Sequence, residues 1–200
     1  MTNGGLLGRA ELEHAFTVLG ERLARRGVVA DLFVVGGAAM ALAYDANRVT
    51  RDVDATCVPH GVVLEEARNV AEEPDLPPWW LNEQASAYVS TQKDVGSREV
   101  FDHQGIRVMA ASPEHVFAMK AFAARSRDEK DLRTLAAIVG IGTLDAALSC
   151  VDASSPRSPC RQGHTPCSRN CSSPARDLSR QSARGLGTGT SEKAATVLLA

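Results

Sequence analysis

The sequence lacks any long hydrophobic run, and this excludes a membrane-spanning helix. No apolar stretch in its 200 residues reaches the roughly 18 residues that such a helix needs. The opening residues 1–8 are polar and glycine-rich, without the basic start and apolar stretch of a signal peptide. We therefore expect a cytoplasmic protein.

Aromatic residues and net charge are also low. Aromatics make up 4% of the chain, and the formal net charge is −2 at pH 7. So few aromatics exclude an extended base-stacking platform for single strands, and the net charge excludes a chain that is basic as a whole. Any contact with nucleic acid must therefore come from a local group of basic side chains.

Large apolar residues become scarce after about residue 150. Residues 1–149 carry 15 Lys+Arg and 21 Asp+Glu, a balance of −6, whereas residues 150–200 carry 7 and 3, a balance of +4. Ser, Pro, Gly and Arg fill much of the second part, which cannot bury enough apolar surface to offset the entropy of ordering. We expect a globular domain at 1–150 and a low-complexity, disordered tail at 151–200.

Four of the five cysteines lie at or beyond that boundary, and two interpretations of them stay open. Cys160, Cys167 and Cys171 surround His164, and Cys150 precedes them. A zinc site usually needs two short ligand pairs in an apolar framework, which this segment lacks. A low-complexity extension with reduced thiols is the better interpretation. The unusual composition of residues 151–200 would also result if this segment were translated from a shifted reading frame.

Hydrophobic periodicity alternates between strand and helix patterns before residue 150. Ser112 and Pro113 supply an N-cap and a first-turn proline for one helix, and Gly140 ends another. The expected helices are 10–26, 38–46, 62–73, 113–124, 128–139 and 143–150, and the expected strands are 28–35, 50–57, 99–102 and 106–110, the last two forming a hairpin. This mixture predicts an α/β (α+β) fold with antiparallel pairing.

Two glycines, Gly36 and Gly37, stand between an expected buried strand and a helix. Without a Cβ atom, their backbone N–H groups can approach a phosphate at the helix N-terminus, where the helix dipole favours an anion. The next strand presents Asp52 and Asp54 on one face, because residues i and i+2 of a strand point the same way. Neighbouring carboxylates repel unless a cation separates them, and Mg2+ binds one or two carboxylates plus substrate phosphates. The two features together predict a site for a metal–nucleoside triphosphate.

These motifs resemble those of a known enzyme superfamily. Gly36-Gly37 followed by Thr50-x-Asp52-x-Asp54 is similar to the signature of minimal nucleotidyltransferases of the DNA polymerase β superfamily. A second block runs from Ala118-Met119-Lys120 through Arg125-x-Arg127 to Lys130-Asp131-Leu132. It resembles the C-terminal motif of the AbiEii-type toxins of bacterial abortive-infection and toxin–antitoxin systems.

The resemblance covers about residues 32–148 and implies a polymerase β-type core, a small mixed sheet flanked by helices. It implies that the glycines hold the triphosphate, that Asp52 and Asp54 bind Mg2+ (or Mn2+), that Lys120 meets a phosphate and that Asp131 completes the active site. The expected catalytic residues are Asp52, Asp54, Lys120 and Asp131, and the expected nucleotide-binding residues are Gly36, Gly37, Arg48, Thr50, Lys120 and Arg125.

The activity that the resemblance implies is transfer of a nucleotide from a nucleoside triphosphate. For the better-understood toxin branch, it implies adding pyrimidine nucleotides to the 3′ end of tRNA, with neutralisation by an antitoxin encoded alongside. We therefore expect an enzyme acting on tRNA, with a cognate antitoxin as partner. Two alternatives stay open: a nucleotidyltransferase that modifies a protein or small molecule, and a non-catalytic antitoxin or regulatory module on the same fold.

Two features depart from the family pattern. Thr134 stands where the second motif commonly ends in another Asp. The third metal carboxylate usual in polymerase β relatives has no clear counterpart, and Asp102 on the hairpin is the candidate for it. Each motif also has a purely structural interpretation, such as a helix cap for Asp131. The adjacent Trp79 and Trp80 are expected in the core or a lid rather than as base stackers.

Overall fold

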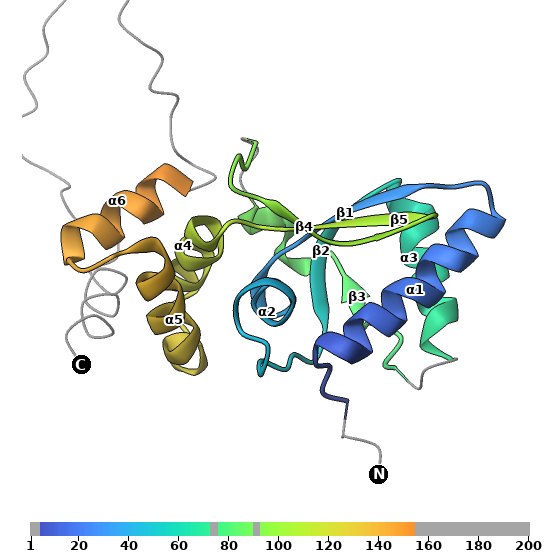
Figure 1. The fold of residues 1–200 in the computed structure, drawn as a ribbon, viewed down its shortest axis with the longest axis horizontal. Helices are drawn as coiled ribbons and strands as arrows, with labels where there is room; N and C mark the ends of the chain where they lie inside the picture. The colour runs from blue at the N-terminus through green and yellow to red at the C-terminus, as the bar shows by residue number, and fades with distance from the viewer. Residues whose placement is uncertain (1–4, 73–75, 90–92, 155–200) are drawn as a thin grey trace, which may run out of the picture.

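The computed structural model describes residues 5–72, 76–89 and 93–154 (Figure 1). In these ranges the chain forms a five-stranded mixed sheet with helices beside it, which confirms the expected fold class. The strands are β1 (Ala30–Val34), β2 (Val53–Val58), β3 (Leu81–Asn82), β4 (Arg98–His103) and β5 (Ile106–Ala110). The α-helices are α1 (Arg9–Arg25), α2 (Gly36–Ala39), α3 (His60–Ala71), α4 (Pro113–Ala123), α5 (Glu129–Val139) and α6 (Leu144–Ser154).

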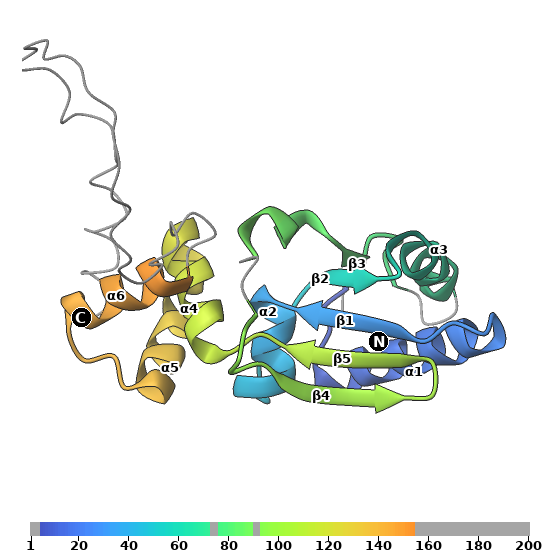
Figure 2. The same ribbon diagram turned by 90° about the horizontal axis from the view of Figure 1, so that it is seen from above.

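The strand order β3-β2-β1-β5-β4 places β1 at the centre of the sheet. β1 runs antiparallel to β2 and parallel to β5, and the β4–β5 hairpin is antiparallel as expected. Helices α1 and α3 contact one face of the sheet. Figure 2 shows α4, α5 and α6 grouped beyond the end of the sheet at which β1 finishes.

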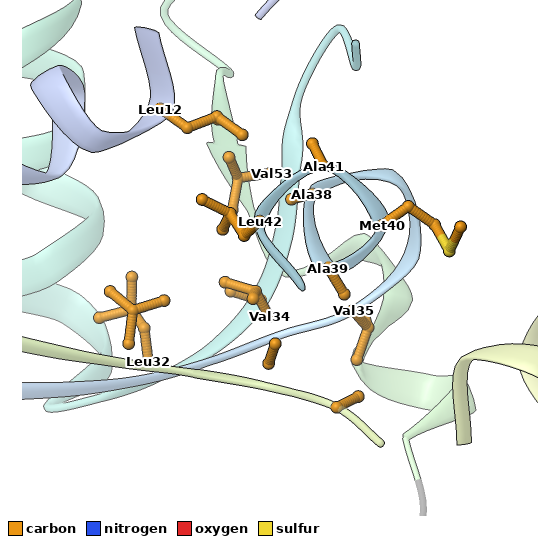
Figure 3. Packing of buried hydrophobic residues seen from close by; sticks show 14 of the residues in the cluster. Leu12, Leu32, Val34, Val35, Ala38, Ala39, Met40, Ala41, Leu42 and Val53 are labelled. Atoms are coloured by element: carbon orange, nitrogen blue, oxygen red, sulfur yellow. The ribbon is translucent and has the colours of Figure 1, made fainter. Parts of the chain in front are cut away.

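Alternation along the strands gives the sheet two different faces. Leu32 and Val34 of β1 and Val53 of β2 are fully buried toward the helices, and Figure 3 shows them packed with Leu12 of α1. The opposite face carries Asp31 and Phe33 of β1, Asp54 and Thr56 of β2, and Arg107 and Met109 of β5, which are exposed or partly buried. We call this second surface the open face. A sheet with one buried and one polar face leaves the polar one available for a site.

Several boundaries differ from the expected ones. β2 begins at Val53 rather than at residue 50, and the helix after β1 begins at Gly36 and continues as a π-helix, η1 (Met40–Tyr44). β3 and the 3-10 helix η2 (Gln84–Tyr88) were not expected. Ser112 caps α4 by accepting a hydrogen bond from the His115 backbone N–H at 3.2 Å, and Gly140 ends α5 in a left-handed conformation, both as expected.

The two adjacent tryptophans have different environments. Trp80 is fully buried, and its indole N–H donates to the carbonyl of Ala67 at 2.8 Å. Its ring lies 6.0 Å from that of Phe16. Trp79 is 54% exposed. The expectation of packing in the core or a lid is therefore confirmed for Trp80, whereas Trp79 lies outside the core.

Some expectations lie outside the described residues. The low-complexity tail and the zinc interpretation of Cys160, His164, Cys167 and Cys171 fall after residue 154. Helix α6 continues four residues past the boundary expected at 150. Within the described ranges no single helix has the length and hydrophobicity to cross a membrane; the pair Ser126–Val139 and Leu144–Ser154, bent by 94°, meets that test only when joined.

Replacing Trp80 by Ala should destabilise the protein far more than replacing Trp79 by Ala. Loss of a buried aromatic side chain and of its hydrogen bond costs about 3–5 kcal/mol, whereas an exposed residue costs about 0.5 kcal/mol. Urea unfolding followed by circular dichroism measures both variants against the wild type. Equal losses would contradict the assignment of Trp80 to the core.

Candidate functional site

A tight turn at the end of β1 forms one side of the site. Val35 is extended, and Gly36 follows with φ of +61°, a left-handed conformation that side chains rarely adopt. A Cβ atom added to Gly36 would lie 3.6 Å from Oδ2 of Asp54. The first helical hydrogen bond runs from the Ala39 N–H to the Val35 carbonyl. The three preceding amides therefore have no acceptor within the helix and can bind an anion.

Asp52 and Asp54 lie beside this turn, as the sequence predicts. Asp54 is in β2 on the open face, next to Gly36, and Asp52 directly precedes the strand. Asn82 of β3, which pairs with Asp54 in the sheet, donates its side-chain N–H to Oδ2 of Asp52 at 3.3 Å. Among the described residues neither carboxylate forms an ion pair within 4.0 Å. The two acids therefore stay free to bind a cation.

The charge environment of Asp54 is unfavourable without a cation. Burial raises the pKa of Asp54 above its usual value, and the negative charge of Asp52 raises it further. The positive charges of Arg125, Arg127 and Lys120 act in the opposite direction but do not cancel the rise. The raised pKa of Asp54 therefore reflects first the burial of its carboxylate and then the like charge of Asp52 close by.

Thr50 lies under the second glycine rather than facing a ligand. Its hydroxyl donates to the backbone carbonyl of Asp52 at 3.0 Å, and its backbone bridges to Leu7. A Cβ atom on Gly37 would lie only 2.6 Å from Oγ1 of Thr50. The hydroxyl proton of Thr50, which the sequence places among the nucleotide-binding residues, is thus used inside the protein. Thr50 and Gly37 instead fix how closely the glycine turn approaches the segment that carries Asp52.

The residues of the second block form a buried network of ion pairs. Nζ of Lys120 lies 2.6 Å from Oδ1 of Asp128 and 2.8 Å from Oδ2 of Asp131, and all three side chains are buried. Nε of Arg48 lies 3.0 Å from Oδ1 of Asp131. Burial alone would raise the pKa of Asp131, but Lys120 and Arg48 together hold it below its usual value. Arg48, Lys120 and Asp131 therefore come together, and their charges are used mainly on one another.

The basic residues that follow α4 divide into two groups. α4 ends at Ala124 in a left-handed conformation, and the exposed Arg125 and Arg127 follow on the side from which they lower the pKa of Asp54. Lys130 pairs instead with Asp45 at 3.6 Å, and Arg133 pairs with Glu129 within α5. Of these four residues, Arg125 and Arg127 are the two that add positive charge at Asp54.

Asp102 does not belong to this site, so it is wrong as a third metal carboxylate. It lies on β4, which β5 and β1 separate from β2. It pairs with Arg107, which in turn pairs with Asp31 near the start of β1. Asp54 lies at the other end of β1, where its carbonyl accepts a hydrogen bond from the Val35 N–H.

Two carboxylates are what the described residues offer to a metal ion at this site. β5 places Met109 opposite Phe33, so it adds no acid there. No group of three or more His, Cys, Asp or Glu side chains with metal-binding geometry occurs in the described ranges. Asp52 and Asp54 nevertheless fit Mg2+, which commonly uses one or two carboxylates and takes substrate phosphates and waters as its other ligands.

Sequence reasoning missed a pocket on the open face, at the paired residues Phe33 and Thr56. It has a volume of about 270 Å³, and its described lining residues are Phe33, Thr56, Val89, Lys93, Asp94, Ser97 and His115. It also missed Asn82, which reaches Asp52 through a strand of two residues. The proline pair before β3 was the available signal for a turn there, but pairing with β2 depends on tertiary structure.

Comparison with known families gives one match. The family described as "Nucleotidyltransferase of unknown function (DUF6036)" matches residues 11–149. The matched range includes the glycine turn, both carboxylates, the ion-pair network and the pocket. No curated protein and no solved structure matches the chain.

Asp54→Asn should stabilise the metal-free protein. Because the pKa of Asp54 is raised on folding, the charged carboxylate is less favourable in the folded state than in the unfolded chain. We expect a gain of about 1 kcal/mol at pH 7, or about 2–4 °C in Tm. The gain should shrink as the pH falls toward the unfolded-state pKa of about 3.9, below which the carboxyl is neutral in both states. Thermal unfolding in EDTA measures it.

The matched control is Asp31→Asn, because Asp31 is an exposed carboxylate on the same face, paired with Arg107 at 3.7 Å. Its loss should change Tm little. Millimolar Mg2+ should raise the Tm of the wild type and of Asp31→Asn but not that of Asp54→Asn. A lower Tm for metal-free Asp54→Asn would contradict the charge repulsion described above.

Lys120→Met should destabilise the fold strongly. It leaves Asp128 and Asp131 buried without their shared cation, and breaking a buried pair in this way costs about 3–5 kcal/mol. Lys130→Met is the control, since Lys130 is 76% exposed in its ion pair, and it should cost about 0.5 kcal/mol or less. Urea unfolding compares the two, and similar values would show that the network contributes little to stability.

Proposed function

The chain belongs to the nucleotidyltransferase family of unknown function DUF6036, and we propose that its open face transfers a nucleotide from a metal-bound nucleoside triphosphate to a hydroxyl group. The observation that carries this proposal is the approach of Gly36 to Asp54. A glycine turn whose amides can bind phosphate lies against Asp54, and neither Asp54 nor its neighbour Asp52 forms an ion pair with another described residue. A divalent cation bound to a polyphosphate satisfies both sides of this arrangement.

Different groups of this site would bind different parts of the metal–triphosphate. The free amides of Gly36, Gly37 and the following residue would hold terminal phosphate oxygens, and Arg125 and Arg127 would add charge from the α4–α5 connection. Asp52 and Asp54 would hold Mg2+, which supplies neutralisation of the charge that develops on the phosphates. Asn82 would keep the carboxylate of Asp52 turned toward the site.

The ion-pair network has a supporting role in this proposal. Lys120 and Asp131 are satisfied by one another and by Arg48 and Asp128, so they fix the position of α4 and α5 against the loop after η1. This position determines where Arg125 and Arg127 emerge. Lys120 lies close enough to affect the charge of Asp54, so a contact with a bound phosphate is compatible with its place.

For the acceptor we propose the 3′ end of tRNA, with the enzyme acting as the toxin of a cytoplasmic toxin–antitoxin pair. The support is the resemblance of the second block to AbiEii-type toxins, which includes Lys120 and Asp131. The attacking group would then be a ribose hydroxyl and the leaving group pyrophosphate. An antitoxin would inhibit by covering the open face.

The test is incubation with each α-labelled ribonucleoside triphosphate, Mg2+ and total tRNA, with protein and small-molecule fractions followed in parallel. We expect label in tRNA and release of pyrophosphate. Asp52→Asn and Asp54→Asn should each reduce the rate by about 100-fold or more, whereas Asp31→Asn, on the same face, should keep the wild-type rate.

Each other outcome has a distinct meaning. Label in protein or in a small molecule keeps nucleotide transfer and replaces the acceptor. No label in any fraction, with wild type and Asp52→Asn indistinguishable and no Mg2+-dependent binding of nucleoside triphosphate, would refute the proposed transfer and favour a binding module on this fold.

A further inference from the structure

Two residues of the loop after η1 pair with two neighbouring residues at the start of α5. Nε of Arg48 lies 3.0 Å from Oδ1 and 3.2 Å from Oδ2 of Asp131, and Nη2 of Arg48 lies 3.2 Å from the same Oδ2. Oδ2 of Asp45 lies 3.6 Å from Nζ of Lys130. The charges are reversed between the two pairs, so exchanging the partners would bring like charges together. The pairs therefore favour one position of the loop against the helix.

Arg48 provides the stronger of these two connections. Its guanidinium meets both oxygens of Asp131, and that carboxylate is buried. A planar guanidinium that binds a carboxylate through two nitrogens fixes direction as well as distance. Lys130 is mostly exposed, and an exposed ion pair contributes little. The position of the loop against α5 therefore depends mainly on Arg48.

Hydrogen bonds fix the chain between Arg48 and the first carboxylate. Nη1 of Arg48 donates to the carbonyl of Val49. The backbone of Thr50 pairs with that of Leu7 through bonds of 2.9 and 2.7 Å, and the Thr50 hydroxyl donates to the carbonyl of Asp52 at 3.0 Å. A shift at Arg48 is therefore a shift relative to Asp52, because the segment between them has little freedom of its own.

The chain on the other side of the ion pair is fixed in the same way. Lys120, which pairs with Asp131, accepts the backbone N–H of Ala124 at its own carbonyl at 3.0 Å. The Asp128 N–H donates to the carbonyl of Arg125, also at 3.0 Å. These bonds hold both ends of the short segment with the two exposed arginines that act on the carboxylates. The ion pair of Arg48 with Asp131 thus joins two fixed segments.

The contacts of Arg48 differ from those of a residue that binds the nucleotide, which the sequence predicts. Each of its three side-chain nitrogens has an acceptor inside the protein, either Asp131 or the Val49 carbonyl. If Arg48 turned to a phosphate, the buried carboxylate of Asp131 would lose one of its two cations. The contacts therefore favour a role in which Arg48 stays in place.

We propose that Arg48 is a positioning residue for the triphosphate: it aligns the segment that carries Asp52 with the segment that carries Arg125 and Arg127, and it does not touch the substrate. Metal and phosphate contacts must be held to within about 0.5 Å to act together, so the affinity that the two arginines provide depends on Arg48. The inference rests on the proposed binding of a triphosphate at this surface.

The test is isothermal titration calorimetry with Mg2+–tripolyphosphate, which carries the phosphates of the substrate without a base. Arg48→Gln should weaken binding about tenfold, the value of a well-aligned hydrogen bond to a charged group. The matched control is Arg133→Gln, since Arg133 is an exposed arginine of α5 that pairs with Glu129 of the same helix. The control should bind as the wild type does. Equal binding by Arg48→Gln and wild type would overturn the proposal.

Asp131→Asn separates positioning from direct contact by the sign of its effect. The change removes a negative charge and releases Arg48, so a direct contact between Arg48 and phosphate would become stronger. Positioning predicts the opposite result, a loss of about three- to tenfold, because the connection to α5 is weakened. Lys120 keeps its pair with Asp128 in this variant. Tighter binding by Asp131→Asn would overturn the proposal.

A double-mutant cycle identifies the residues through which Arg48 acts. In the Arg125→Ala/Arg127→Ala protein, Arg48→Gln should weaken the remaining binding by less than about twofold, since the groups that it aligns are absent. A tenfold loss in this background as well would show that Arg48 binds phosphate itself and would overturn the proposal.

Mg2+ alone provides the readout that a general structural role would change. The rise in Tm with millimolar Mg2+ should be the same in Arg48→Gln as in the wild type, because Thr50 and Leu7 still hold the segment that carries Asp52. Loss of this rise would mean that the substitution disrupts the carboxylates themselves, and alignment would then be refuted as the cause of weaker binding.

Failure of this inference is distinguishable from failure of the proposed function. Weaker tripolyphosphate binding in Arg48→Gln and Asp131→Asn, in a protein that transfers no label to any acceptor, would refute the transfer and keep the role of Arg48. Transfer of label with tighter binding by Asp131→Asn would keep the transfer and refute the positioning role. A wild type that binds no Mg2+–tripolyphosphate would refute both.

Discussion

The repulsion between Asp52 and Asp54 is the constraint on which the site depends. Both carboxylates lie near a turn that brings no side chain of its own, and the described residues supply no ion pair to either. A fold selected for stability alone would place a lysine or arginine between them. The protein instead keeps a raised pKa at Asp54, which a divalent cation on a polyphosphate would relieve. The two unpaired carboxylates thus destabilise the metal-free fold, and the same two carboxylates would bind the metal in the proposed reaction.

The positive charges nearby are arranged so that they do not remove this repulsion. Lys120 is buried against Asp128 and Asp131, the partly buried Arg48 also pairs with Asp131, and the charges within this group balance. The group therefore acts as a fixed connection between the helices after the sheet and the loop after η1. Arg125 and Arg127, which emerge from that connection, stay exposed and available to a substrate. Burial thus separates the cations that hold the fold from those that can bind phosphate.

The sequence was sufficient for the local features and insufficient for those that depend on strand order. Periodicity located α1 and the β4–β5 hairpin, and the glycine turn beside Asp54 followed from residue type and spacing. Asn82 was missed because it lies 30 positions from Asp52 along the chain, and only the sheet topology brings the two side chains together. The prediction of Asp102 as a third metal carboxylate was wrong for the same reason. The register of β4 and β5 determines which end of the sheet Asp102 lies at, and the sequence does not show that register.

The negative balance of residues 1–149 does not prevent this surface from binding polyanions. At physiological ionic strength charges are screened over about 8 Å, so the groups adjacent to a phosphate decide its binding rather than the sum over the domain. Arg125 and Arg127 act on Asp54 from the connection between α4 and α5, and Lys93 is exposed at the pocket on the open face. These cations can attract negative substrate groups locally although the domain as a whole is acidic. An acidic domain can in this way hold two polyanions at one reacting phosphorus, provided that a divalent cation completes the balance between them.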